Sequence, residues 1–280
     1  MPYTAEISRT HPSCFLFLID QSGSMKHPFP SSEGARAKSE ALADAINRLL
    51  QNLVIKCAKS EGIRDYYEVG VIGYGGGAVG PAFGGNLAGK ELVPVSELGK
   101  NPIRVEPRTR KMDDGAGGII TQQVKFPVWF EPRALGETPM CEAFEQANHV
   151  LSKWILAHPK SFPPIVINIT DGKPTDGNPA QAAFDLMSQR TFDGEVLLFN
   201  LLISAARMNP VEFPDTDLVL SDEYARSLFS ISSPLPEYMR RMLADEGINS
   251  NLNSRGFVFN ADLVSVIRFL DIGTRPANMR

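Results

Sequence analysis

The feature that most constrains this chain is an unbroken apolar run at residues 14–19 (CFLFLI), which ends abruptly at Asp20. A strand without polar alternation is typically covered on both faces, as in the middle of a parallel sheet. Comparable runs occur at residues 68–74, 164–170 and 195–204, and polar or helical segments separate them. This alternation predicts an α/β fold, with a doubly wound, mostly parallel sheet that is flanked by helices.

Helices are expected where apolar residues recur every three or four positions. The first such segment spans residues 33–60, in which alanines and leucines keep this spacing. A second begins at a Thr-Pro pair, which is typical of a helix start, and runs from residue 138 to about residue 158. Further helices are predicted from residue 178 to about 190 and at residues 261–272, with a short strand at residues 256–259.

Two long segments interrupt the alternation within what we expect to be a single domain, residues 1–280. Residues 75–126 are rich in Gly and Pro and contain strand-like pieces at 91–95 and 123–126, which predicts a β-hairpin insertion at a sheet edge. Residues 208–254 are polar and predict short helices, notably at 236–246. Each insertion is either a partner-specific decoration or plain surface, because binding often resides in loops on a rigid scaffold.

Charge and cysteine content narrow the class of protein. The net charge of −4 and the pI near 5.7 disfavour a nucleic-acid or anionic-membrane partner, since both attract basic surfaces. The three cysteines lie far apart in apolar or helical contexts, which favours buried, reduced thiols. The polar first twelve residues do not resemble a signal peptide, and the run at 14–19 is too short to span a bilayer. We therefore expect a cytoplasmic protein that binds neither nucleic acid nor membrane.

Three separated polar features are predicted to meet at one edge of the sheet. The motif Asp20-x-Ser22-x-Ser24 directly follows the first strand, Asp171 follows another buried strand, and Thr138 begins a helix. Loops at the carboxyl ends of neighbouring parallel strands share one crevice. These side chains offer only hydroxyl and carboxylate oxygens, which suit a hard cation such as Mg²⁺. No His or Cys accompanies them, which disfavours zinc or copper.

The sequence FLFLIDQSGSM, with Thr138 and Asp171 in the same order and context, resembles the metal-ion-dependent adhesion site (MIDAS) of the von Willebrand factor A (VWA) domain family. The resemblance spans nearly the whole chain and implies a Rossmann-like VWA fold. It implies that Ser22, Ser24 and Thr138 bind the metal through their hydroxyls, while Asp20 and Asp171 act through water. The implied cation is Mg²⁺, with Mn²⁺ or Ca²⁺ as alternatives.

The function that this resemblance implies is non-catalytic binding. A Glu or Asp side chain of a partner protein would complete the coordination of the cation. The segments GETPM and ITDGKPTDG resemble intracellular bacterial members of the family, including the tellurite-resistance-associated TerY-like group. That likeness implies an adaptor whose partners include a protein kinase or a PP2C-type phosphatase.

Each of these residues also has an ordinary structural role. Ser22 and Ser24 are common in turns, Asp20 at strand ends and Thr138 at helix N-caps, and Asp171 precedes a glycine turn. Taken one at a time, the residues favour these structural roles. Their order, and the position of each at a strand end or helix start, favours the metal site.

The same residues are compatible with other functions. A Mg²⁺-dependent phosphohydrolase of the haloacid-dehalogenase type also starts with a strand-end Asp, but it needs a second Asp where this chain has Ser22. A structural subunit whose metal only stiffens the loops is a further alternative. Gly75-x-Gly77-x-x-Gly80 formally matches a dinucleotide fingerprint, yet no helix is predicted after it. Asp176 fits the turn before the helix at 178 and is not expected to belong to the site.

Overall fold

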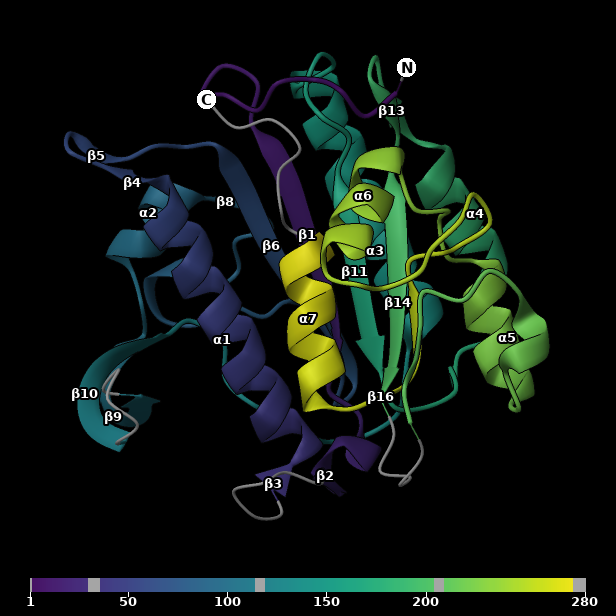
Figure 1. Cartoon of the computed structure of the whole chain (residues 1–280), viewed down its shortest axis with the longest axis horizontal. Coiled ribbons are helices and arrows are strands. Elements are labelled where there is room, and N and C mark those ends of the chain that lie inside the picture. The colour runs from purple at the N-terminus through teal and green to yellow at the C-terminus, as the bar shows by residue number, and fades with distance from the viewer. Residues whose placement is uncertain (1, 30–35, 114–118, 204–208, 274–280) are drawn as a thin grey trace.

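Strand β1 (Ser13–Asp20) lies in the middle of an eight-stranded sheet, as its apolar run predicts. The computed structural model describes residues 2–29, 36–113, 119–203 and 209–273. Within these residues the sheet has the order β15–β16–β14–β11–β1–β6–β7, and β8 also pairs with β6. Figure 1 shows this sheet between two layers of helices.

The five long strands of the sheet are parallel, and three short strands join it antiparallel. β1 pairs with β6 and β11, β11 with β14, and β14 with β16, all in parallel register. The α/β, doubly wound and mostly parallel fold is therefore confirmed. The remaining bounds are β6 (Tyr67–Gly75), β7 (Ala78–Pro81), β8 (Val93–Pro94), β11 (Ile165–Thr170), β14 (Leu197–Ile203), β15 (Val211–Glu212) and β16 (Phe257–Ala261).

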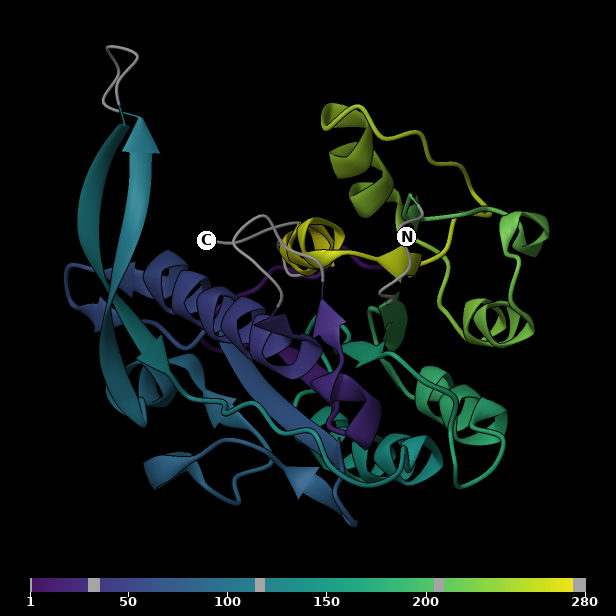
Figure 2. The same ribbon diagram turned by 90° about the horizontal axis from the view of Figure 1, so that it is seen from below.

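Helices cover both faces of the sheet (Figures 1 and 2). On one face lie α1 (Lys38–Cys57), α2 (Val95–Lys100), α6 (Glu237–Asp245) and α7 (Leu263–Gly273); on the other lie α3 (Met140–Ala157), α4 (Ala180–Ser188) and α5 (Glu223–Ser230). Among the described residues, no helix combines the length and the apolarity that crossing a bilayer requires.

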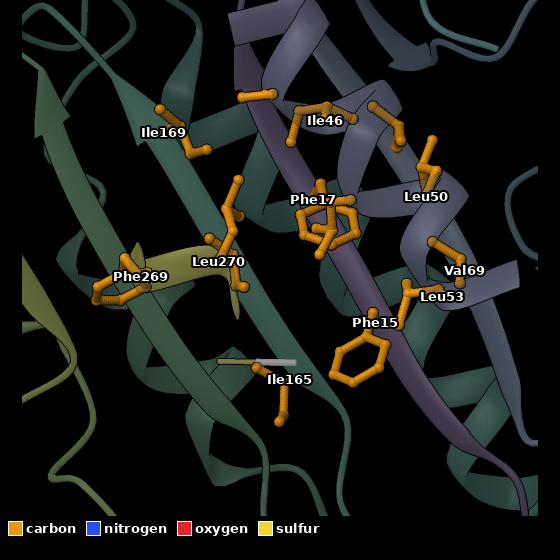
Figure 3. Packing of buried hydrophobic residues seen from close by; sticks show 14 of the residues in the cluster. Phe15, Phe17, Ile46, Leu50, Leu53, Val69, Ile165, Ile169, Phe269 and Leu270 are labelled. Carbon is orange, nitrogen blue, oxygen red and sulfur yellow. The ribbon is translucent and has the colours of Figure 1, made fainter. Parts of the chain in front are cut away.

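Side chains of β1 alternate between the two resulting cores. Phe15 and Phe17 belong to the core under α1 and α7, whereas Leu16 and Leu18 belong to the core under α3 and α4. Figure 3 shows the first of these cores, where the rings of β1 meet side chains of α1 such as Leu50. Because apolar groups cover both faces of β1, its sequence does not alternate between polar and apolar residues.

Helix α1 is shorter than the predicted helix at residues 33–60. Before it, β3 (Arg36–Ala37) pairs antiparallel with β2 (Pro28–Phe29), and residues 30–35 lie outside the described part of the chain. After it, β4 (Ala58–Lys59) pairs with β5 (Gly62–Ile63). The prediction was wrong at both ends for one reason: the flanking backbone groups find hairpin partners, which side-chain periodicity does not reveal.

The other predicted elements form within a few residues of their expected bounds. Helix α3 begins at Met140 rather than at residue 138. Helix α4 ends at Ser188, before the predicted residue 190, because β12 (Arg190–Thr191) turns back to pair with β13 (Gly194–Glu195). The strand at 195–204 is β14, and the strand and helix near the end are β16 and α7.

The first insertion, residues 75–126, contains the predicted edge hairpin as β7, which pairs with β6. The predicted strand at 91–95 is mostly wrong: only Val93 and Pro94 form β8, and Val95 starts the buried helix α2. A 3-10 helix, η2 (Gly85–Leu87), lies between β7 and β8 in the sequence. The segment 123–126 lies in β10, as a strand was predicted there.

The largest part of this insertion is a long hairpin that is separate from the central sheet. It consists of β9 (Arg104–Asp113) and β10 (Ile119–Val128), which pair along their whole length. Figure 2 shows it projecting from the body of the molecule beside α1. Arg108 on β9 forms an ion pair with Asp44 of α1 at 2.9 Å, which anchors the base of the hairpin.

The second insertion, residues 208–254, contributes to both helical layers. It contains β15, the 3-10 helix η3 (Asp217–Val219), α5 and α6, of which α6 matches the helix predicted at 236–246. Met239 of α6 is buried in the same core as Phe17 of β1, whereas Leu228 of α5 is buried in the core on the opposite face of the sheet. The insertion therefore packs against the body rather than standing apart from it.

Phe17→Ala is expected to lower the free energy of unfolding by about 3–5 kcal/mol, because removal of a buried ring leaves a cavity in the core. Phe17 is 0% exposed, and the matched control Phe192 is 79% exposed. Phe192→Ala is therefore expected to change the free energy by less than about 0.5 kcal/mol. Urea denaturation followed by circular dichroism measures both, and equal losses would contradict the central position of β1.

Candidate functional site

The loop that follows β1 turns at once into a 3-10 helix, η1 (Gly23–Lys26). Oδ1 of Asp20 accepts a hydrogen bond from the backbone N–H of Ser22 at 2.8 Å, which closes the turn. The hydroxyl oxygens of Ser22 and Ser24 lie 3.0 Å apart. Because Asp20 and Ser22 are buried, the turn keeps a carboxylate and a hydroxyl away from bulk water.

Asp171 reaches this loop from the neighbouring strand. β1 and β11 pair in parallel with Ile19 level with Ile169, so that both strands end at the same edge. There, the Ser24 hydroxyl donates a hydrogen bond to Oδ1 of Asp171 at 2.5 Å. Two of the predicted site segments are thus in direct contact across 147 residues of sequence.

Thr138 approaches from the loop before α3 and is buried. Its N–H donates a hydrogen bond to the hydroxyl of Thr175 at 3.0 Å, which ties this loop to the segment after β11. A Cβ built on Gly172 would lie 3.8 Å from the Ser24 hydroxyl oxygen and 3.9 Å from that of Thr138. The two hydroxyls therefore border the same small space, and the five predicted residues come together.

The structural alternative for Thr138, that it caps α3, is wrong. The N-cap of α3 is Pro139, which has no side-chain hydrogen bond to the helix. The carboxylate of Asp176 caps the helix instead, from the loop after β11: it accepts hydrogen bonds from the N–H groups of Cys141 at 3.2 Å and Glu142 at 3.0 Å. The sequence predicted only a local turn at Asp176, because the residues that it caps lie 34 and 35 positions away.

Backbone contacts hold the three loops at a fixed spacing. The N–H of Gly23 donates to the carbonyl oxygen of Gly136 at 2.9 Å, and the N–H of Leu135 donates to that of Gln21 at 2.8 Å. Gly75 has a φ of 142°, and a Cβ there would lie 2.5 Å from the carbonyl carbon of Gln21. Gly75, the last residue of β6, thus allows close packing of the site loop, and β7 rather than a helix follows it.

Two side chains that touch the carboxylates were not predicted. The Thr170 hydroxyl, on the last residue of β11, donates a hydrogen bond to Oδ2 of Asp20 at 2.7 Å. Nζ of Lys38, the first residue of α1, lies 2.7 Å from Oδ2 of Asp171. The sequence did indicate that Thr170 ends a strand, which places its hydroxyl near the site. No sequence pattern indicated the contact of Lys38, because its partner Asp171 lies 133 residues away.

Burial dominates the electrostatics of Asp20. Removal from water raises the pKa of its carboxyl group, and the nearby charge of Asp171 raises it further. Hydrogen bonds from Ser22 and Thr170 act in the opposite direction. The folded loop therefore holds a carboxylate whose charge is only partly compensated by neutral donors, and this favours the approach of a cation.

The oxygen atoms at this edge match the ligand preference of a small hard cation. In octahedral coordination at about 2.1 Å, neighbouring oxygens lie about 3 Å apart, and the hydroxyls of Ser22 and Ser24 are 3.0 Å apart. Among the residues that the structure describes, no group of three or more His, Cys, Asp or Glu side chains gathers around a common point. The oxygens that converge at this edge come from three hydroxyls and two carboxylates, which are hard donors.

A hollow of about 390 Å³ opens beside the site. Lys173 and Pro174, which directly follow the Asp171 loop, line one side, and Tyr224 and Leu228 of α5 line the other. Burial raises the pKa of Tyr224, and the negative charges of Asp20 and Asp171 add to this effect. The second insertion thus frames the surface next to the cluster.

A buried row of polar side chains crosses the sheet and was also not predicted. The Tyr74 hydroxyl donates to Oδ1 of Asn168 at 2.7 Å, and Asn168 donates to Oδ1 of Asn200 at 3.0 Å. Asn200 in turn donates to the hydroxyl of Ser232 at 2.9 Å. The only signal was an Asn within each of two apolar runs. The row links β6, β11 and β14 to the end of α5, close to the site.

Thr170→Val is expected to lower the free energy of unfolding by about 1–3 kcal/mol, because the buried carboxylate of Asp20 loses a hydrogen-bond donor. Thr109, which is exposed on β9, is the matched control, and Thr109→Val is expected to be nearly neutral. Chemical denaturation measures both variants. A loss at Thr109 as large as that at Thr170 would argue against this role of the buried hydroxyl.

Comparisons with known proteins leave the family open. No model of a protein family matches the chain, and no curated protein matches its sequence. The chain has an α/β fold with a mostly parallel central sheet and helices on both faces. At the carboxyl edge of that sheet lies a buried cluster of hydroxyls, carboxylates and one lysine.

Proposed function

We propose that this chain is a VWA-type protein-binding module, in which a divalent cation held at the carboxyl edge of the sheet binds an acidic side chain of a partner protein. The hydroxyls of Ser22, Ser24 and Thr138 would hold the cation. Asp20 and Asp171 would act on it through water. The cation would supply an electrophilic position for a Glu or Asp of the partner.

The observation that carries this proposal is the convergence of two serine hydroxyls and a carboxylate at the edge of the sheet. The hydroxyls of Ser22 and Ser24 are hydrogen-bonded to each other with their oxygens 3.0 Å apart, and this separation equals the spacing of neighbouring ligands around Mg²⁺ or Mn²⁺. The Ser24 oxygen is also 2.5 Å from Oδ1 of Asp171. Turn formation accounts for one serine with its backbone hydrogen bond, but it does not require two hydroxyls and a carboxylate from a distant strand to converge.

The same contacts favour binding over catalysis. Both carboxylates of the cluster already have partners: Asp20 accepts from Ser22 and Thr170, and Asp171 pairs with Lys38. The phosphohydrolase alternative needs a second carboxylate two residues after Asp20 as its acid–base group, and that position is Ser22. Neutral hydroxyl ligands leave the charge of a cation available to an incoming carboxylate.

The hollow beside the cluster is suited to the residues that flank such a carboxylate. Its lining combines apolar groups such as Pro174 and Leu228 with the exposed cation Lys173. A partner segment with an acidic residue next to an apolar one would fill both positions. By resemblance to TerY-like proteins, the partner class that we propose is an intracellular protein kinase or a PP2C-type phosphatase.

Asp20→Ala and Ser22→Ala are expected to abolish partner capture while the domain stays folded, because each removes a group of the metal site. Affinity capture from the native organism, with and without EDTA, measures this. Ser60→Ala is the matched control, since Ser60 is exposed far from the cluster in sequence and outside the contacts of the site. Its capture is expected to equal that of the wild type.

Two results would contradict the proposal. Capture that survives EDTA unchanged would show that no metal is needed, and would favour a structural subunit whose insertions form the interface. Turnover of generic phosphoesters that requires Mg²⁺ and disappears in Asp20→Ala would favour the phosphohydrolase. Inactivity in that screen agrees with a binding module.

A further inference from the structure

We propose that the ammonium group of Lys38 is a permanent positive charge of this site. This charge weakens the binding of the divalent metal and gives the metal-loaded site a net positive charge. This inference rests on the proposed function and concerns the regulation of the same site. It comes from a contact that no part of the sequence pattern suggested, the ion pair between Lys38 and Asp171.

The ion pair is almost completely withdrawn from water. The side chain of Lys38 is 7% exposed and that of Asp171 is 0% exposed, with Nζ and Oδ2 2.7 Å apart. The other carboxylate oxygen of Asp171 accepts the hydrogen bond from Ser24. The ammonium group therefore lies one carboxylate away from a hydroxyl that is proposed to bind the metal.

The position of Lys38 within its helix is unfavourable by itself. It is the first residue of α1, where the helix dipole disfavours a positive charge, and its N-cap Ala37 offers no side-chain hydrogen bond. Burial of a lysine at this point also carries a desolvation cost. The carboxylate of Asp171 is the feature of the structure that compensates for both.

The chain also fixes where the ammonium group can go. Pro28 pairs with Ala37 in the β2–β3 ladder, and the N–H of Lys38 donates to the carbonyl oxygen of His27 at 3.0 Å. His27 directly follows η1, so Lys38 is anchored to the same loop that carries the two serines. A divalent ion at those serines and the ammonium of Lys38 therefore act on one carboxylate at close range.

Charge counting gives the consequence. The carboxylates of Asp20 and Asp171 and the ammonium of Lys38 together carry one negative charge, and a divalent ion makes the cluster singly positive. A carboxylate from a partner then neutralises it. Without Lys38, the metal alone would neutralise the two carboxylates, and an incoming carboxylate would leave a buried negative charge. Lys38 thus opposes the metal and favours the partner's acid.

Titration of Mn²⁺ by isothermal calorimetry tests this inference. Lys38→Gln, which keeps a donor for Asp171 but removes the charge, is expected to bind Mn²⁺ at least about tenfold more tightly than the wild type (~1.4 kcal/mol). Lys38→Arg, which keeps the charge, is expected to stay close to the wild type. Lys26→Gln removes an exposed lysine of the same loop and is expected to have no effect.

The outcomes separate this inference from the proposed function. Equal Mn²⁺ affinity in the wild type and Lys38→Gln overturns the inference alone. Binding by Lys38→Gln but not by the wild type supports the inference and overturns metal dependence of the natural chain. Absence of binding in all folded variants overturns both. Circular dichroism establishes folding, and Lys38→Met is the second neutral variant if Lys38→Gln does not fold.

Acetate is the probe for the effect on the partner's carboxylate. Added to the Mn²⁺-loaded proteins, it is expected to displace metal-bound water more readily in the wild type than in Lys38→Gln, because the loaded wild-type site is positive. Water-proton relaxation follows the displacement. Equal or stronger acetate binding by Lys38→Gln would overturn this part of the inference.

Discussion

The parallel pairing of β1 with β11 places Ile19 level with Ile169, so that the two strands end side by side, at Asp20 and Thr170. The contacts between the two segments, Thr170 with Asp20 and Ser24 with Asp171, depend on this register. A shift of one residue would turn Asp20 or Thr170 towards the opposite face, since side chains alternate along a strand. The register is in turn held by the two cores, because Phe17 and Leu18 must stay on their own faces of the sheet.

The cluster places charged groups where water has little access, and the surrounding contacts reflect that cost. Burial raises the pKa of Asp20, and hydrogen bonds from Ser22 and Thr170 partly offset the effect. Asp171 is compensated differently, by the ammonium of Lys38. Unpaired buried charges are strongly destabilising, so these partners stabilise the edge of the sheet. The same arrangement leaves the cluster with a charge that a divalent cation is able to reverse.

Local patterns predicted the elements whose partners lie close in sequence or whose side chains report their surroundings. The apolar runs predicted β1, β6, β11 and β14, and helical spacing predicted α1, α3, α4 and α7. These patterns failed where backbone hydrogen bonding decides whether a segment forms a strand or a helix. Arg36 pairs in β3 rather than extending α1, and Val95 begins a helix rather than ending a strand. The insertion at 75–126 does contain a hairpin strand at the sheet edge, β7, but its longest hairpin, β9 with β10, is separate from the central sheet and contacts α1 through Arg108 and Asp44.

For the site, the sequence by itself determined which oxygen-bearing side chains follow the buried strands: Asp20, Ser22, Ser24 and Asp171, with Thr138 before α3. Strand ends are readable because they coincide with the end of an apolar run. Only the tertiary structure decided that Thr170 and Lys38 contact the two carboxylates and that Asp176 caps α3. Those contacts join residues that lie 150, 133 and 34 positions apart, and hydrogen bonds and ion pairs over such separations leave no periodic trace in the chain.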